Sequence, residues 1–312
     1  MTIETQREEA RSWAETPPLS PSLRHLSGEF VADQAWLDKL ADPLQKFLGK
    51  FYSAPRMAGW KKVLNGVWLG HPVHPAVTDI PIGAWSSTLL LDVIWLNSEH
   101  PDMARAADVT LLLGLGGAGV AAVTGLTDWS DTDATDRRMG MLHGLLNGSA
   151  TVMNVASFLA RRMGKRRTGI ALSTLAFLVT SVSAYFGGEL SYAKGIGINH
   201  VAWEGGSDDF VPVISLADLP EKKLMRVDAA GTPVVLWKEG QTISALSAIC
   251  SHLGGPLDEG TCEEGAITCP WHGSRFALKD GSVLQSPAVY AQPTFAVRVR
   301  NNQVELRRLE HA

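Results

Sequence analysis

The sequence lacks several features that would place it in a common functional class. Its net charge is −4 and it has no concentrated basic patch, which argues against binding to nucleic acid. It contains no nucleophile motif and no phosphate-binding loop. The first 30 residues are polar and include no apolar core segment, so we expect no N-terminal signal peptide. Only three cysteines are present, and Cys262 has no pairing partner in the pattern described below.

Charged residues are also missing from most of the long apolar stretches in the first two thirds of the chain. Four stretches follow one another, at about Ile80–Leu96, Val109–Leu126, Met139–Ala160 and Thr168–Gly188. The last three contain no Asp, Glu, Lys or Arg, and each is close to the ~20 residues that span a bilayer. The first stretch is weaker because it contains Asp92. We expect an all-α bundle of four transmembrane helices over residues 71–198.

The segment before this bundle, residues 1–70, has a different character. It begins as a charged tail, and Asp33–Leu64 then places apolar residues near helical spacing with lysines between them. That pattern is typical of an amphipathic helix lying on a membrane surface. It suits equally well an ordinary helix packed on another domain, and both interpretations stay open.

The membrane half has a polar signature at its first span, His71-Pro-Val-His74-Pro. With this motif the stretch from Leu40 to Val201 resembles a family of uncharacterised four-helix bacterial membrane proteins. The resemblance implies a fold but no biochemical function.

Several further polar residues are expected at the same end of the four spans. Ionisable residues in membrane spans are expensive and point to function by default. Two histidines from different helices could ligate a b-type haem, with His74 and His143 as the favoured pair. A quinone pocket is the second reading, and hydrogen bonding between helices is the third. The candidate residues for a haem or quinone site are His71, His74, Asp79, Asp128, His143, Asn147 and His200.

Four residues near the C-terminus form the pattern C-x-H-x16-C-x2-H: Cys250, His252, Cys269 and His272. Two thiolates and two imidazoles on two short loops are the ligands of a Rieske [2Fe–2S] cluster, in which two Cys hold one iron and two His the other. A structural zinc site is the rival reading, although zinc motifs usually pair Cys with Cys and His with His.

The residues around these ligands look like the two cluster-binding loops of the Rieske family. In high-potential members each loop carries a second Cys, and the two form a disulfide. Here those positions are Gly255 and Trp271, and a Tyr near the cluster is replaced by Phe276, while Ser274 keeps a hydroxyl. Fewer hydrogen bonds to sulfur imply a potential toward the low end of the Rieske range. The resemblance is therefore to Rieske ferredoxins.

The C-terminal residues 211–309 have the size and pattern of a small all-β Rieske domain. Residues 295–300 alternate in polarity, and Asn301-Asn302 then predicts a hairpin turn. Residues 199–210 form an acidic linker that we expect to be flexible. The expected protein is thus multidomain, with an all-α four-helix transmembrane bundle followed by an all-β domain.

This combination predicts a protein that carries single electrons between a redox partner protein or quinone and an acceptor, while embedded in membrane lipid. The alternative is a redox sensor whose cluster state changes its docking on the membrane domain. A Rieske oxygenase is disfavoured because the forty residues after His272 leave no room for a catalytic iron domain.

The location follows less directly from the sequence. Lysines and arginines at the ends of the spans divide equally between the two faces, so the positive-inside rule gives no orientation. The absent signal peptide and the unpaired Cys262 favour a cytoplasmic Rieske domain. We expect a multi-pass protein of the bacterial cytoplasmic membrane.

Overall fold

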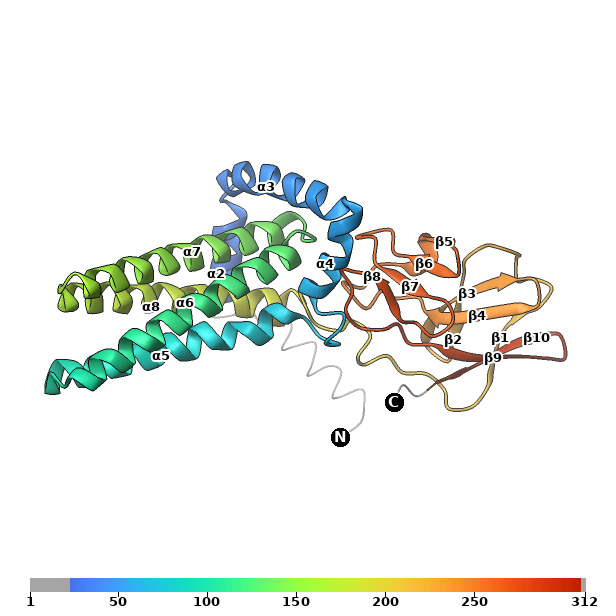
Figure 1. Cartoon of the computed structure of the whole chain (residues 1–312). Coiled ribbons are helices and arrows are strands. Elements are labelled where there is room, and N and C mark those ends of the chain that lie inside the picture. The colour runs from blue at the N-terminus through green and yellow to red at the C-terminus, as the bar shows by residue number, and fades with distance from the viewer. Residues whose placement is uncertain (1–22, 310–312) are drawn as a thin grey trace, which may run out of the picture.

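A helical part and a β-sheet part meet end to end in the computed structural model of the chain (Figure 1). The structure describes residues 23–309, with the side chains of residues 23–26 and 55 left out. The expected charged N-terminal tail lies outside the described residues. The β domain docks on one end of the helical bundle, and the other end of the bundle points away from it.

Four long helices form the bundle as two antiparallel hairpins. They are α5 (Val73–Ser98), α6 (Pro101–Trp129), α7 (Ala134–Arg162) and α8 (Arg166–Gly188). Proline at the first position of α6 costs no hydrogen bond there, and the His100 side chain caps this end by accepting the Asp102 N–H at 3.3 Å. Gly164, with φ +77°, makes the tight turn between α7 and α8. The expected all-α bundle is confirmed.

Three of these helices are long and apolar enough to cross a membrane. Among the described residues they are α5, α6 and the segment Arg166–Ala193, which adds the short π-helix η1 (Glu189–Ala193) to α8. Helix α7 falls short because the polar side chains of His143, Asn147 and Asn154 lower its hydropathy. Its role as a fourth span stays a prediction.

The outer surface of the bundle suits lipid, and its interior is tightly packed. Large apolar side chains point outward from all four helices, among them Leu90, Val109, Leu113, Val152 and Leu178. Inside, a Cβ on Gly114 would lie 2.2 Å from Nε1 of Trp85, so only glycine lets α6 approach α5 here.

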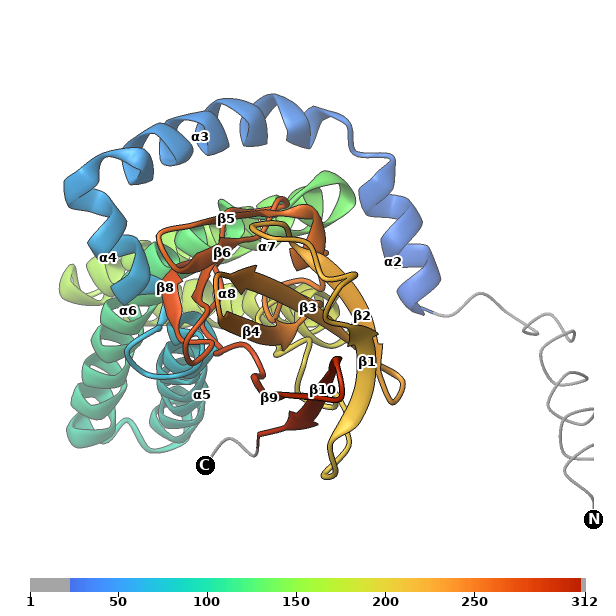
Figure 2. The same ribbon diagram turned by 90° about the vertical axis from the view of Figure 1, so that its right-hand side faces the viewer.

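The N-terminal helices form an arch over the end of the bundle that meets the β domain (Figure 2). They are α2 (Leu23–Ala32), α3 (Trp36–Ser53) and α4 (Pro55–Asn65). Helix α3 buries Leu37, Ala41 and Leu48 against Trp129 and Met141 of the bundle.

Helix α3 is also held by charge, since Asp38 pairs with Arg137 at 2.7 Å and with Arg138 at 2.5 Å. The hydrogen bond from Arg138 has the largest effect on the pKa of Asp38, and together with the bond from Arg137 it lowers that pKa to about 2. The other side of α3 exposes Trp36, Phe47 and Phe51. The helix therefore packs on the bundle, and contact of its exposed aromatic side with a membrane surface stays a prediction.

The β domain consists of three small antiparallel sheets with strand orders β1-β10-β9, β2-β3-β4 and β5-β6-β7-β8. The hairpin expected at Asn301-Asn302 joins β9 to β10, with both asparagines at positive φ. The strands are β1 (Val211–Ser215), β2 (Met225–Ala229), β3 (Thr232–Glu239), β4 (Thr242–Ser247), β5 (Thr261–Glu263), β6 (Ala266–Thr268), β7 (Arg275–Ala277), β8 (Val283–Gln285), β9 (Phe295–Arg300) and β10 (Gln303–Arg308).

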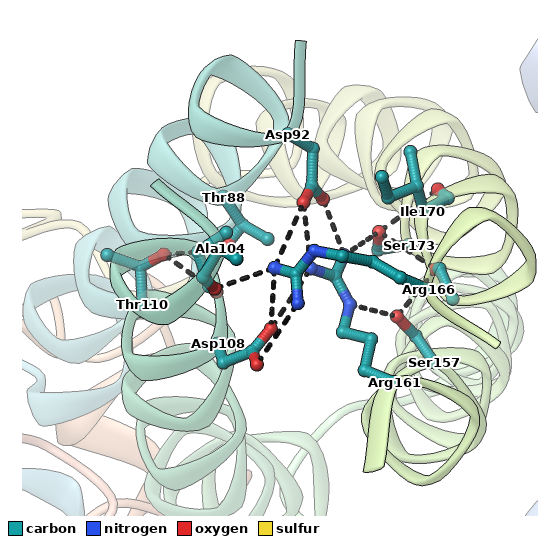
Figure 3. A network of polar contacts seen from close by, with 12 residues as sticks. Thr88, Asp92, Ala104, Asp108, Thr110, Ser157, Arg161, Arg166, Ile170 and Ser173 are labelled. Atoms are coloured by element: carbon teal, nitrogen blue, oxygen red, sulfur yellow. Dashed lines mark hydrogen bonds and ion pairs between the residues drawn. The ribbon is translucent and has the colours of Figure 1, made fainter. Parts of the chain in front are cut away.

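A buried ionic network ties the four long helices together (Figure 3), near the turns that lie away from the β domain in Figure 1. Arg161 of α7 makes a two-pronged ion pair with Asp92 of α5 at 2.7 and 2.5 Å, and both side chains are at most 1% exposed. Asp108 of α6 and Arg166 of α8 complete the network at 3.0 Å. The charges balance, which is the condition for burying them.

We predict that Asp92→Leu will lower the free energy of unfolding by about 3 to 5 kcal/mol, because it leaves the Arg161 guanidinium buried without its main partner. The double variant Asp92→Leu/Arg161→Met removes both charges and should recover a large part of this loss. Unfolding of detergent-solubilised protein, followed by circular dichroism, measures both. A double variant less stable than Asp92→Leu would show that the pair itself supplies the stability.

Candidate metal centre and its docking surface

Two loops with the same backbone hydrogen bonds carry the four predicted ligands. In the first, between β4 and β5, the Cys250 N–H donates to Gly255 O at 2.8 Å and the Gly254 N–H donates to Cys250 O at 2.9 Å. In the second, between β6 and β7, Cys269 is bonded to Ser274 and Gly273 in the same way, at 2.8 and 3.1 Å. Gly254 and Gly273 have φ near +70°, a conformation that glycine adopts without strain.

The four ligand side chains come together as a pair of sulfurs and a pair of rings. The thiols of Cys250 and Cys269 are buried and lie within hydrogen-bonding range of each other. The rings of His252 and His272 have centroids 5.1 Å apart. Among the described residues no three His, Cys, Asp or Glu side chains converge on one ion. Two separate pairs suit a cluster with two irons better than a single zinc, which needs all four ligands around one centre.

The two ring nitrogens of His272 have different surroundings. Nε2 donates to Oδ2 of Asp133 at 3.0 Å, since a carboxylate can only accept. Nδ1 is buried and has no hydrogen-bond partner among the described residues. A buried ring nitrogen with a free lone pair is the atom that a metal ligand requires, and its opposite nitrogen is held as a metal-bound histidine usually is. The donor set therefore fits a [2Fe–2S] cluster.

Small residues and backbone amides surround the two sulfurs. A Cβ on Gly255 would lie 2.9 Å from Sγ of Cys269 and 3.0 Å from the Trp271 ring, so the loops require glycine here. Backbone N–H groups of both loops hydrogen-bond the sulfurs. Ser274 is fully buried and its Oγ accepts the Ala288 N–H at 3.0 Å, whereas the buried Phe276 ring offers no donor.

Cys262 lies apart from this centre. It is on β5, where it pairs with Ile267 of β6 and packs at the edge of the core around the ligands. Burial raises the pKa of its thiol to about 11, so it stays protonated at neutral pH. Its position agrees with the expectation of a free thiol that is not a ligand.

The histidine side of the centre faces the end of the helical bundle. Besides the His272–Asp133 contact, the His200 N–H donates to Ser251 O at 3.1 Å and the Tyr290 hydroxyl donates to Gly197 O at 3.3 Å. We call this contact between the β domain and the helical part the dock. A cavity of about 30 Å³, enough for one water molecule, remains within it. Its lining includes His252 and Ser251 of the β domain and Asn65, Pro72 and Asp128 of the helical part.

The seven residues proposed for a haem or quinone site fall into three groups. His74, His143 and Asn147 lie together inside the bundle, where the two rings have centroids 6.4 Å apart and Asn147 donates to Nε2 of His143 at 3.1 Å. Asp128 and His200 lie at the dock instead, and Asp128 accepts from Asn65 at 2.7 Å. His71 and Asp79 are exposed on the outside of the helical part.

Two residues of the dock were not singled out from the sequence. Asp133, in the loop between α6 and α7, contacts a ligand directly, and Asp131 in the same loop forms an ion pair with Lys61 of α4 at 2.6 Å. Burial raises the pKa of Asp131, opposed by Lys61. The signal that could have found them is the run of aspartates at 128, 131 and 133, which follows the second span on the face expected to carry the β domain.

Comparisons with known proteins agree with this division. Residues 209–296 match the model of the Rieske [2Fe-2S] domain, and residues 70–200 match that of a predicted membrane protein family, DUF2231. The chain therefore carries a Rieske [2Fe–2S] domain, and it is joined to a domain of the DUF2231 family.

Several relatives of known name match about a third of the chain. Apoptosis-inducing factor 3 from Mus musculus is 29% identical over 100 residues, which are 32% of this chain and 16% of the relative, so the chain spans about a sixth of its length. The ferredoxin component of the naphthalene 1,2-dioxygenase/salicylate 5-hydroxylase systems from a Ralstonia species is 27% identical over 101 residues, which cover 97% of it. The solved ferredoxin of carbazole 1,9a-dioxygenase from Nocardioides aromaticivorans IC177 is 28% identical, covering 31% of this chain and 96% of its own, with a TM-score of 0.31.

We predict that Cys250→Ser and His272→Ala will abolish the cluster, because each removes one ligand of an iron. Cys262→Ser is the matched control and should keep it. Labile sulfide and the paramagnetic signal of the reduced protein measure cluster content. A signal that survives in Cys250→Ser would refute the ligand assignment, and iron lost from Cys262→Ser would show that the third cysteine has been misassigned.

Proposed function

We propose that this protein is a membrane-anchored Rieske carrier that exchanges single electrons with a site in its own membrane domain. The observation that carries the proposal is the dock, because both ligand histidines lie at the surface that meets the bundle. A bound Rieske cluster takes up and releases one electron at a time. The relative from a Ralstonia species, named as the ferredoxin component of dioxygenase and hydroxylase systems, supports the role of electron carrier for this domain.

The residues of this chain would hold the ligands in place and set their basicity. Asp133 accepts a hydrogen bond from His272 and so fixes the orientation of the ring, and a carboxylate in this position makes the imidazole a stronger ligand. Burial of Cys250 and Cys269 keeps water from the sulfurs. Both effects favour the oxidised form and a potential low in the Rieske range.

Two groups in the helical part could exchange electrons with the cluster. One is a haem held by His74 and His143, and the other is a quinone bound at the dock near Asn65 and Asp128. The dock offers an unpartnered polar atom, since Oδ1 of Asn65 is buried without a hydrogen bond among the described residues. Its cavity holds no more than a water molecule, so a quinone would enter only if the β domain moved away.

Such a movement would have its hinge close to the bundle. The linker, residues 199–210, was expected to be flexible, but its second half is bonded to the β domain. The Ser247 hydroxyl donates to Oε1 of Glu204 at 2.8 Å, and the Arg308 N–H donates to Ser207 O at 3.0 Å. A swing would therefore occur before Glu204. The membrane location also belongs to this proposal, with four spans and the Rieske domain on the cytoplasmic side of a bacterial membrane.

A sensor is the second candidate, and the same contact favours it. Because Asp133 bonds a ligand directly, a change in the charge of the cluster changes the strength of the dock. In a sensor the reduced cluster would persist with no acceptor nearby, whereas a carrier would lose its electron to the membrane domain.

We predict that Asp133→Asn will raise the midpoint potential of the cluster and slow its reoxidation, because the amide is a weaker acceptor for His272 than the carboxylate. The exposed Asp218, on the β domain away from the ligand loops, provides the matched control Asp218→Asn, which should change neither quantity. Redox titration and stopped-flow absorbance of the pre-reduced protein in lipid nanodiscs, mixed with a soluble quinone, measure both. Reoxidation equally fast in Asp133→Asn and wild type would mean that electrons do not leave through the dock.

A further inference from the structure

The two hairpins of the bundle place corresponding residues at corresponding positions. His74 on α5 and His143 on α7 each stand 18 residues before a charged residue, Asp92 and Arg161 respectively. Eighteen residues are five helical turns, so each histidine shares a helix face with its charged residue. The histidines meet at one end of the bundle and the charges at the other. The hairpins thus form a pseudo-two-fold repeat whose axis runs along the bundle, and ligand sites in membrane proteins often lie between such repeats.

The surroundings of the two histidines repeat as well. Nδ1 of His74 donates to Ala121 O on α6 at 2.9 Å, and Nδ1 of His143 donates to Ser183 O on α8 at 2.8 Å. Four residues after each of these carbonyls stands a glycine against the ring. A Cβ on Gly125 would lie 2.7 Å from His74, and one on Gly187 would lie 3.0 Å from His143.

These bonds fix the same tautomer in both rings. A carbonyl only accepts, so Nδ1 carries the proton in each ring and Nε2 keeps a lone pair. Asn147 agrees with this, because its amide N–H donates to Nε2 of His143. A metal-binding histidine usually has one nitrogen held by a backbone carbonyl and turns the lone pair of the other toward the metal. His74 has this arrangement, whereas the Nε2 lone pair of His143 accepts from Asn147, which would have to give way to a metal.

The distance between the centroids of two ligating imidazole rings depends on how the rings are arranged around the metal. With a metal–nitrogen bond of about 2.0 to 2.1 Å, the metal lies roughly 3.2 Å from the centre of a ligating ring. Two rings on opposite sides of one metal then have centroids about 6.4 Å apart, and two rings at a tetrahedral angle have centroids about 5.2 Å apart. The centroids of His252 and His272 lie 5.1 Å apart, close to the tetrahedral value, and those of His74 and His143 lie 6.4 Å apart, close to the value for opposed rings.

We propose that His74 and His143 are the axial ligands of one haem of the b type, an iron porphyrin bound on the pseudo-two-fold axis of the bundle. A porphyrin supplies the four equatorial ligands itself, so two opposed imidazoles complete its iron. No third His, Cys, Asp or Glu joins them among the described residues, and a zinc site would need one.

The repeat also sets the number of haems. At the far end of the bundle the corresponding positions hold Asp92 and Arg161, whose side chains bond each other and Ser173. Neither of these two positions carries an imidazole, so we expect one haem per chain and not two. The inference deepens the proposed function and rests on it for the role of the haem: His74 and His143 would hold an iron that could accept the single electron given up by the reduced cluster, with no bond made or broken.

The first measurement is the pyridine haemochrome spectrum of full-length protein purified in detergent from cells supplied with haem, with labile sulfide assayed on the same sample. We expect one haem for each cluster. His74→Ala and His143→Ala should lose the haem and keep the paramagnetic signal of the cluster, which shows that the chain has folded. His71→Ala, three residues from His74 but exposed, is the matched control and should keep both.

A conservative variant separates a ligand from a structural histidine. His143→Met should keep the haem with a raised midpoint potential, because thioether–imidazole ligation favours ferrous iron, and a merely structural histidine would give no such shift. A wild-type protein with intact cluster and no haem overturns this inference and leaves the proposed carrier function to the reoxidation experiment. Haem that survives in both His74→Ala and His143→Ala overturns the ligand assignment.

Discussion

Polar groups inside a lipid-facing bundle must find their partners within the bundle, because the hydrocarbon offers none. This constraint explains most of what the interior contains. Thr88 bonds Thr110 across the first hairpin at 2.9 Å, and His74 bonds a carbonyl of α6. The costliest group, the Arg161 guanidinium, has all of its nitrogens bonded to Asp92, Asp108, Ser157 and Ser173. Each helix thereby depends on its neighbours for register.

The dock follows a different logic, since few hydrogen bonds hold it and a water-sized cavity remains within it. Its contacts are single hydrogen bonds from His200, Tyr290 and His272 around a water-sized cavity. Exposed or partly exposed bonds of this kind contribute little each. A contact that can open without much loss suits a carrier that meets more than one partner, and it also lets the state of the cluster influence docking.

The sequence reveals the metal centre more fully than the dock. All four ligands lie in two short loops with their glycines, so a local pattern specifies the chemistry, and the composition of the long apolar stretches predicts the helices. Asp133 was missed because its contact with His272 joins residues 139 positions apart and no local pattern encodes it. For the same reason the seven candidate haem or quinone residues were expected together at one membrane face, yet the fold places His74 with His143 and moves Asp128 and His200 to the dock.

The two ends of the bundle show how one repeated hairpin serves two purposes. An ionic network at the far end holds four helices, and its strength depends on complementary charges, two of them at the equivalent positions Asp92 and Arg161. At the end beside the β domain, two identical imidazoles cannot bond each other while both Nδ1 atoms donate to carbonyls, so each Nε2 lone pair must take its donor from another group. Asn147 satisfies one of them from the same helix, four residues away. The lone pair of His74 has no such donor beside it on α5, where the corresponding residue is Thr78, whose hydroxyl donates to Pro75 O. This asymmetry distinguishes two otherwise equivalent positions, and a metal between the rings would give the nitrogen of His74 a partner at the end of the bundle beside the β domain.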